Sequence, residues 1–172
     1  LLKSKNKISI FNRTIKKAQK LSKYGAIVSL SIDQLVKDKD VIITMLTDDK
    51  AVNQIISSKK FQQNINKKTT VIDMSSTKPI TALNNYKKLK KLGVYFLDAP
   101  VSGGTKGAED ASLAIMVGGD AKIYEKSKKL LRTMGSPTLV GSNGSGQIAK
   151  LCNQIIVLSL IHISEPTRQL QI

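Results

Sequence analysis

The feature that most constrains the fold is a regular alternation of short aliphatic runs with amphipathic segments. Residues 41–46 form a continuous apolar run, as expected for a strand that is buried on both faces of a parallel sheet. Residues 69–74 form a second such strand. Helix signals follow each strand: Asp48 and Asp49 after the first, and Pro79 after the second. The alternation predicts an α/β protein with a Rossmann-like, doubly wound, mostly parallel sheet.

The same reasoning assigns the remaining elements. Strands are expected at residues 7–11, 26–28, 41–46, 69–74, 94–97, 113–117 and 138–140, and helices at 14–24, 31–36, 48–56, 79–93 and 120–134. A further helix is expected to open in the run that begins at Gly144. Thr14, Ser31 and Asp120 suit the N-cap position of their helices, and Gly25 suits the end of the first helix.

Two glycine-containing runs indicate chemistry. The run Asp98-Ala-Pro-Val-Ser-Gly-Gly-Thr-Lys-Gly-Ala-Glu-Asp110 leaves an apolar strand, and its glycines allow backbone N–H groups to approach a small anion closely. The run Gly144-Ser-Gly-Gln-Ile-Ala-Lys-Leu-Cys-Asn153 opens a helix and places Lys150 and Asn153 on one helical face. An anion-holding turn together with a partly buried lysine suits proton transfer on a small carboxylated substrate.

These two runs resemble the β-hydroxyacid dehydrogenases in order and spacing. The same resemblance includes the segments at residues 11–14, 40–46 and 71–76. This is the family of 3-hydroxyisobutyrate dehydrogenase, tartronate semialdehyde reductase and glyoxylate-succinic semialdehyde reductase, and it is related to 6-phosphogluconate dehydrogenase. The resemblance covers residues 1–160. It implies an NADP-dependent oxidoreductase that interconverts a short β-hydroxyacid and its semialdehyde by hydride transfer.

The resemblance also implies roles for single residues in the two glycine-containing runs. Lys150 would be the general acid and base, with its pKa lowered by partial burial. Ser102, Gly103 and Gly104 would hold the substrate carboxylate, and Asn153 would hydrogen-bond the substrate. Simpler interpretations remain: an ordinary glycine turn, and a lysine that extends from a helix start to solvent. Gln154 stands where many relatives carry a second asparagine, which leaves the substrate open.

Cofactor contacts are expected from three segments. One segment comprises Asn12, Arg13 and Thr14, which follow the strand whose end contacts the adenosine ribose in dinucleotide-binding folds. An acidic residue at that position favours NAD. Arginine and a hydroxyl group suit the 2′-phosphate of NADP instead. NADP is therefore the expected cofactor and NAD the alternative. By resemblance, Met45, Leu46 and Ser76 would border it as well. Alternatively, Thr14 only caps a helix, Arg13 is solvated and Met45 is a core residue.

The two ends of the chain carry expectations of their own. No G-x-G-x-x-G turn precedes residue 7. The chain is therefore expected to lack the first, central strand of the fold, which would leave its neighbours without ladder partners, so that the fragment folds poorly and is inactive. Residues 1–140 are interpreted as a partial NADP-binding domain and residues 141–158 as the start of an all-helical substrate and dimerisation domain. Residues 159–172 resemble a non-native tail, so His162 is given no role.

Composition limits the classes of partner. The net charge of +16 comes almost entirely from lysine, because arginine occurs only at Arg13, Arg132 and Arg168. The lysines are spread over several predicted helices without aromatic stacking platforms, which argues against specific nucleic-acid binding.

Further expectations concern location and assembly. We expect a cytoplasmic protein that has no membrane segment and needs no metal. The whole protein is expected to be a homodimer or homotetramer. Cys152 is expected to be a buried core thiol. The alternatives are a non-catalytic NADP-binding module and a basic nucleic-acid-binding fragment.

Overall fold

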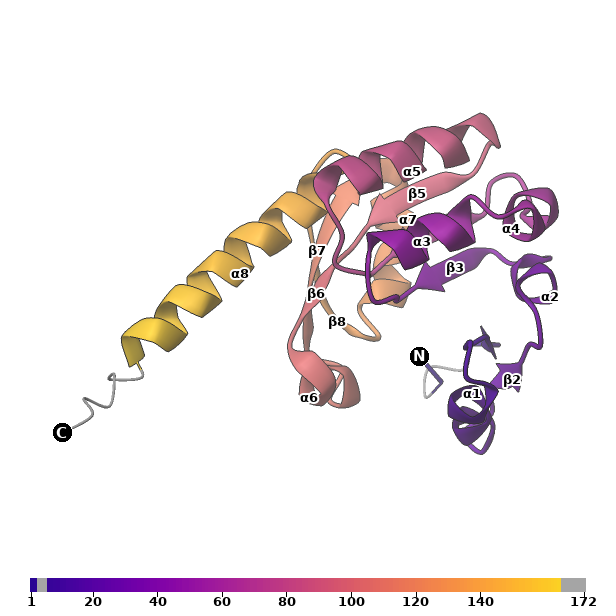
Figure 1. Ribbon diagram of the computed structural model, residues 1–172, viewed down its shortest axis with the longest axis horizontal. Coiled ribbons are helices and arrows are strands. Elements are labelled where there is room, and N and C mark those ends of the chain that lie inside the picture. The colour runs from indigo at the N-terminus through magenta and orange to yellow at the C-terminus, as the bar shows by residue number, and fades with distance from the viewer. Residues whose placement is uncertain (3–5, 165–172) are drawn as a thin grey trace.

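The computed structural model describes residues 1–2 and 6–164. Its strands are β1 (Ser9–Ile10), β2 (Ile27–Val28), β3 (Val41–Thr44), β4 (Thr70–Asp73), β5 (Tyr95–Asp98), β6 (Val101–Ser102), β7 (Leu113–Gly119) and β8 (Gly135–Gly141). Its helices are α1 (Ile15–Ser22), α2 (Ile32–Val36), α3 (Asp49–Ile56), α4 (Lys59–Asn64), α5 (Pro79–Lys91), α6 (Gly104–Glu109), α7 (Ala121–Leu131) and α8 (Ser145–Ser164). Strands and helices alternate along most of the chain, as the sequence predicts (Figure 1).

Six strands form the main sheet, in the order β3-β4-β5-β7-β6, with β8 paired to β7. The pairs β3–β4, β4–β5 and β7–β8 are parallel, whereas β5–β7 and β6–β7 are antiparallel. The carboxyl ends of β3, β4 and β5 therefore lie at one edge of the sheet, where open α/β sheets bind their ligands. The prediction of a Rossmann-like, mostly parallel sheet is confirmed.

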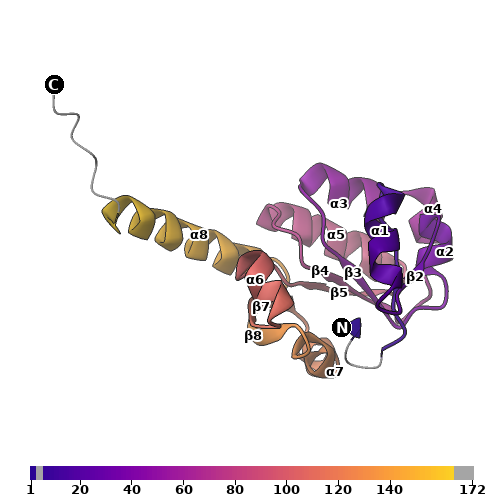
Figure 2. The ribbon, with the colours of Figure 1, turned by 90° about the horizontal axis from the view of Figure 1, so that it is seen from below.

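Helices cover both faces of this sheet (Figure 2). Successive residues of a strand point to opposite faces, and the core divides accordingly. Val71 of β4 and Phe96 of β5 pack in one cluster with residues of α3 and α5, whereas Ile72 and Leu97 pack in a second cluster with residues of α7. Burial on both faces explains why the strand sequences read as continuous apolar runs.

The strands β1 and β2 form a separate parallel pair with the register Ser9↔Ile27. Among the strands of the described residues, none pairs with β3 on the side away from β4. Figure 1 shows the β1–β2 pair beside α1 at the lower end of the molecule. The poor folding expected from this defect stays a prediction.

Three elements were not predicted from the sequence: α4, α6 and β6. The helix α4 has a single buried apolar residue, Phe61, so it shows no helical periodicity; the Ser58 hydroxyl accepts a hydrogen bond from the Phe61 N–H at 3.2 Å and starts the helix. Among the predicted caps, the Asp120 carboxylate accepts from Lys122 N–H and Ile123 N–H. The hydroxyls of Thr14 and Ser31 occupy N-cap positions but make no capping hydrogen bond.

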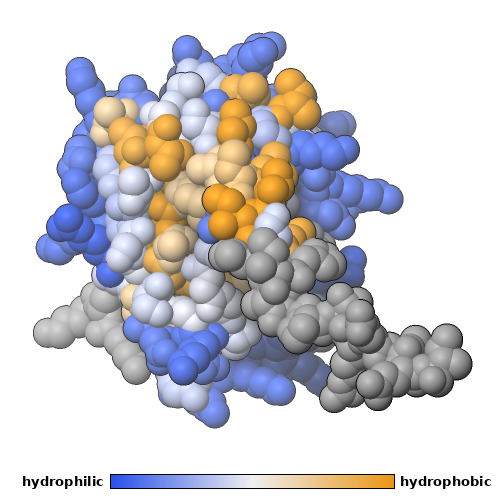
Figure 3. All heavy atoms as spheres, turned by 90° about the vertical axis from the view of Figure 1, so that its left-hand side faces the viewer, coloured by the Kyte–Doolittle hydropathy of each residue, from blue (hydrophilic) through white to orange (hydrophobic). Residues whose placement is uncertain are grey.

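The last helix, α8, projects away from the body of the molecule (Figure 1). Its exposed apolar residues are Ile148, Leu151, Ile155, Ile156, Val157 and Leu158. On the side of the molecule from which α8 projects, apolar atoms gather over the middle of the face and are bordered by hydrophilic atoms (Figure 3). Cys152 is exposed as well, so its assignment to the core was wrong, because among the described residues this side of α8 is left uncovered. None of the helices among residues 1–2 and 6–164 has both the length and the hydropathy needed to cross a bilayer.

Candidate active site at the start of α8

The start of α8 is fastened to the carboxyl end of β5 by Asp98. This side chain is fully buried, and its carboxylate accepts hydrogen bonds from Gly144 N–H at 2.7 Å and Gln147 N–H at 3.2 Å. Burial raises the pKa of Asp98, and the two backbone donors act against that rise. The acceptor satisfies amide groups at the helix start that have no partner within the helix.

The glycine spacing in the run at residues 144–146 follows from close backbone packing. A Cβ at Gly146 would lie 2.5 Å from the carbonyl oxygen of Met116 and 2.6 Å from that of Asp98. Such contacts are shorter than real Cβ atoms allow. The first turn of α8 therefore rests directly on the backbones of β5 and β7, which only glycine permits.

Gln147 joins the same helix to the end of β4. Its side chain accepts a hydrogen bond from Thr77 N–H at 3.0 Å and donates one to Ser75 O at 2.8 Å. The Ser75 hydroxyl in turn accepts from Leu46 N–H at 2.9 Å. This chain of bonds runs from the end of β3 through the end of β4 to α8, and it fixes the helix against the ligand-binding edge of the sheet.

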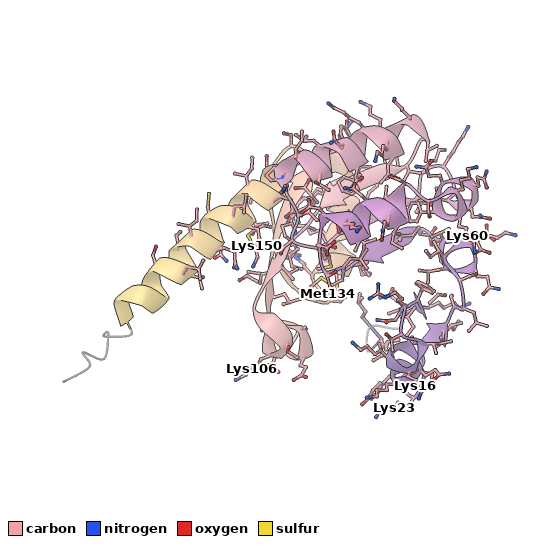
Figure 4. All side chains as sticks on the ribbon, viewed as in Figure 1. Lys16, Lys23, Lys60, Lys106, Met134 and Lys150 are labelled. Carbon is pink, nitrogen blue, oxygen red and sulfur yellow. The ribbon has the colours of Figure 1, made fainter. Side chains whose placement is uncertain are left out.

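One turn further along α8, Lys150 lines a cavity of about 220 Å³ together with Ser76 at the end of β4. Asp49, Lys78 and Gln154 also line this cavity. Partial burial of Lys150 lowers the pKa of its ammonium group, because desolvation disfavours the charged form. Figure 4 places Lys150 on the half of α8 nearest to the sheet. A lysine with a lowered pKa beside a cavity can exchange a proton with a bound molecule.

Asp49 is the acidic group of the cavity. A hydrogen bond with the side chain of Thr81, followed by one from Lys78 N–H at 3.0 Å, holds the pKa of Asp49 below its ordinary value despite some desolvation. The carboxylate therefore stays ionised. It gives the cavity a fixed negative charge opposite the amines of Lys78 and Lys150.

The predicted carboxylate turn and the predicted amide meet in the structure. Asn153 Nδ2 donates a hydrogen bond to Ser102 Oγ at 3.2 Å, across 51 positions in the chain. Gly103 follows β6 with φ +133°, and Gly104 begins α6 with φ +62°; both conformations favour glycine. A Cβ at Gly103 would also approach the Leu113 side chain to 3.3 Å. The structure thus brings Ser102 and its glycines next to the helix that carries Lys150.

The three residues expected at the ribose are exposed and follow β1. The Asn12 side chain accepts a hydrogen bond from Thr14 N–H at 2.8 Å, which shapes the turn into α1. These residues do not line the Lys150 cavity. They lie on the separate β1–β2 unit, which Figure 1 shows apart from the end of β3.

Met45 and Leu46 follow the end of β3. Met45 is 65% exposed, so its alternative interpretation as a core residue was wrong. The reason is that β3 ends at Thr44 and Met45 lies beyond the last ladder pair, Thr44↔Asp73. Leu46 is half-buried and is held through its backbone by Ser75.

Three residues of the site were missed as functional candidates: Asp49, Lys78 and Gln147. Asp49 was taken only as a helix-start residue, although an acidic residue after a strand end was a usable signal. Gln147 stands within the glycine run, where a long polar side chain between small residues indicates a tertiary hydrogen bond. Across residues 1–2 and 6–164, no cluster of three His, Cys, Asp or Glu side chains is arranged to hold a metal ion.

Comparison with known proteins identifies the family of the chain. A family model described as the NAD binding domain of 6-phosphogluconate dehydrogenase matches residues 1–148. The chain belongs to this family. It is 38% identical over 151 residues to 2-hydroxy-3-oxopropionate reductase of Escherichia coli, which covers 86% of this chain and 52% of that protein. It is 37% identical over 167 residues to the mitochondrial 3-hydroxyisobutyrate dehydrogenase of Drosophila melanogaster, which covers 96% of this chain and 51% of that protein.

Among solved structures, the chain matches Mycobacterium tuberculosis 3-hydroxyisobutyrate dehydrogenase with a TM-score of 0.87 and 30% identity, over 91% of this chain and 53% of that one. The resemblance to β-hydroxyacid dehydrogenases is confirmed. The chain spans about half the length of the curated relatives that it matches.

Proposed function

We propose that the protein containing this chain is an NADP-dependent oxidoreductase that interconverts a short β-hydroxyacid and its semialdehyde. The observation that carries the proposal is the convergence on α8: Lys150 lies beside a cavity, and Asn153, on the same helical face, bonds Ser102 of the glycine turn. The names of the relatives support the substrate class, since 2-hydroxy-3-oxopropionate and 3-hydroxyisobutyrate are both short carboxylated hydroxy compounds. The chain by itself is proposed to be inactive, because it spans about half of those relatives.

The residues present fit the two ends of a dinucleotide. Near the cavity, the backbone of Leu46 and the exposed Ser76 stand at the carboxyl ends of adjacent parallel strands. At the other end, Arg13 and Thr14 are exposed after β1, where a guanidinium and a hydroxyl suit the 2′-phosphate of NADP. NAD remains the alternative. The buried Oδ2 of Asp73 at the end of β4 has no hydrogen-bond partner, so this edge of the sheet retains an unused acceptor.

In the proposed mechanism, a bound nicotinamide cofactor would supply the hydride chemistry, and the side chains of α8 would transfer the proton. Lys150 Nζ takes the hydroxyl proton in oxidation and returns it to the carbonyl oxygen in reduction. Its lowered pKa makes the neutral amine accessible at a pH where an ordinary lysine stays charged. Asn153 and Ser102 orient the substrate, and the backbone N–H groups at Gly103 and Gly104 hold its carboxylate.

The test is turnover of the whole protein with NADPH and small semialdehydes. Lys150→Ala is expected to lower kcat by about a hundredfold to ten-thousandfold, the range for loss of a general acid or base, while NADPH affinity is retained. Lys87→Ala is the matched control, since it removes an exposed lysine of α5 that does not line this cavity. Near-wild-type turnover of Lys150→Ala would overturn the assignment. NADPH binding without turnover of any semialdehyde in the wild type would favour the non-catalytic module.

A homodimer or homotetramer is proposed for the whole protein. Its support is the exposed apolar surface of α8, which includes Ile155 and Ile156 at 65% and 59% exposure. Apolar surface of this kind marks contact with another protein surface.

A further inference from the structure

A second, larger cavity lies at the opposite edge of the main sheet. Its volume is about 650 Å³, within the range of small-molecule sites. Lys67 and Lys68 border it just before β4, and Gly93 and Val94 border it just before β5. The amino ends of parallel strands lie opposite their carboxyl ends, so this cavity is separate from the one that holds Lys150, and the two have no lining residue in common.

The charge of this cavity is strongly positive. Five lysines border it: Lys67, Lys68, Lys90, Lys122 and Lys126. They come from three separate places, namely the loop before β4, the helix α5 and the helix α7. The acidic group among the lining residues is Asp120, whose carboxylate is engaged by Lys122 N–H at 2.8 Å and Ile123 N–H at 3.1 Å. All five lysines are exposed, and an anion bound between them would lower their mutual repulsion.

The cavity also offers aromatic and apolar surface. Tyr86 and Tyr95 supply two rings, whereas the apolar lining residues Val94, Phe96 and Ile123 are buried and present little surface. Tyr95 is 38% exposed, so part of its ring is open to solvent. Lys90 Nζ lies 5.4 Å from the centroid of the Tyr86 ring, which places a cation directly beside an aromatic face. A ligand with a planar ring and several negative charges would match both surfaces.

The loops that carry the lysines are held in place. Lys68 has φ +67°, and its N–H donates to Gly93 O at 2.8 Å. Gly93 has φ +72°, and a Cβ there would meet Lys67 Cγ at 3.4 Å. Asn143 Nδ2, also in the lining, donates to Phe96 O at 3.0 Å. Backbone that is fixed in this way loses little conformational entropy when a ligand binds.

We propose that this cavity binds a nucleoside di- or triphosphate, with the base against Tyr95 and the phosphates between the lysines. The lysines of α7 and of the loop before β4 neutralise the phosphates as point charges. Such a ligand would act from the opposite edge of the sheet to the dinucleotide, so the site is independent of the proposed active site.

Calorimetric titration of the whole protein with ATP tests the site. Lys122→Gln/Lys126→Gln is expected to weaken binding by about tenfold, since it removes two phosphate-facing charges. The matched control is Lys16→Gln/Lys20→Gln, which removes two exposed lysines at the same spacing from α1. Figure 4 shows Lys16 at the far end of the molecule from α5 and its neighbours. The control is expected to change the affinity by less than about twofold.

Further titrations separate the ring from the phosphates and this cavity from other sites. Tyr95→Leu is expected to weaken the binding of ATP and to leave the affinity for inorganic triphosphate unchanged. NADP is expected not to displace bound ATP. Equal effects of the two double-lysine variants, full displacement by NADP, or tighter binding of triphosphate than of ATP would each overturn the proposal. So would duplex DNA that binds more tightly than ATP and loses affinity in the α7 variant.

Discussion

The carboxylate of Asp98 and the backbone N–H of Gly144 lie 2.7 Å apart and connect the end of β5 to the turn that begins α8. This bond joins the two glycine-containing runs of the sequence, because Asp98 opens the first run and Gly144 opens the second. It fixes the orientation of α8 and therefore the position of Lys150 relative to the strand ends.

Removal of that acceptor should loosen the helix. Asp98→Ala leaves Gly144 N–H and Gln147 N–H buried without a partner, and we expect the free energy of unfolding to fall by about 3 kcal/mol. Asp98→Asn keeps one side-chain acceptor and is expected to lower the free energy of unfolding by less. Urea denaturation followed by circular dichroism measures both variants. Equal losses would contradict the prediction, because they would show that one remaining side-chain acceptor does not support the start of α8.

Acidification should stabilise the fold through Asp73. Burial raises the pKa of this carboxyl above its unfolded value, although Ser75 and Thr44 donate hydrogen bonds to it. The folded chain therefore binds a proton at a higher pH than the unfolded chain does. The free energy of unfolding accordingly gains a contribution as pH falls through the raised pKa towards the ordinary carboxyl range.

Urea midpoints at pH 7 and pH 5 test this behaviour of Asp73. Asp73→Asn should reduce the gain on acidification, and the part that remains is assigned to Asp98, whose pKa burial also raises. Glu109→Gln, at an exposed position at the end of α6, serves as the control and should leave the pH dependence unchanged. An unchanged gain in Asp73→Asn would contradict the prediction.

The hydrogen bond between Asn153 and Ser102 should make these residues act as a unit in substrate binding. Asn153→Ala and Ser102→Ala are each expected to raise KM for the semialdehyde by about threefold to tenfold in the whole protein. The double variant should show less than the product of the two effects, since each single change already breaks the bond. Steady-state kinetics of the wild type, the two single variants and the double variant measures this coupling. If the two effects on KM multiply fully, the two residues are uncoupled.

Gly146 in the first turn of α8 and Gly104 at the start of α6 should differ sharply in their tolerance of a larger side chain. Gly146→Ala forces a Cβ against two backbone oxygens at 2.5 Å and 2.6 Å, and we expect a loss of about 3 kcal/mol in stability. Gly104→Ala meets no atom within 4 Å and bears only the cost of φ +62°, about 1 kcal/mol. Thermal unfolding of the two variants gives the comparison. A reversed order would show that the contact at Gly146 relaxes freely.

Cys152 should react in the native state. Its side chain is exposed on α8, so a thiol reagent such as dithionitrobenzoate should label it without denaturant. The labelling rate in buffer should then approach that in urea, whereas a buried thiol would react only on unfolding. Protection in the native chain would show that another molecule covers this face of α8.

The amino-acid sequence by itself determined the layout of this protein. Alternating apolar runs and helix signals predicted the doubly wound sheet, because period and length distinguish strands from helices locally. The family resemblance that the glycine-containing runs carry implied that Ser102 and its glycines would share a site with Lys150 and Asn153. The sheet prediction succeeded because strand and helix periodicity are local properties of the sequence.

Only the tertiary structure decided what surrounds each residue. Met45 and Cys152 read as core residues but are exposed, because a strand end and a projecting helix leave them uncovered. Gln147, Asp49 and the five lysines of the second cavity gain their surroundings from segments far apart in the sequence. Burial and electrostatic environment depend on which distant surfaces meet, and that is a property of the packed chain rather than of any local pattern.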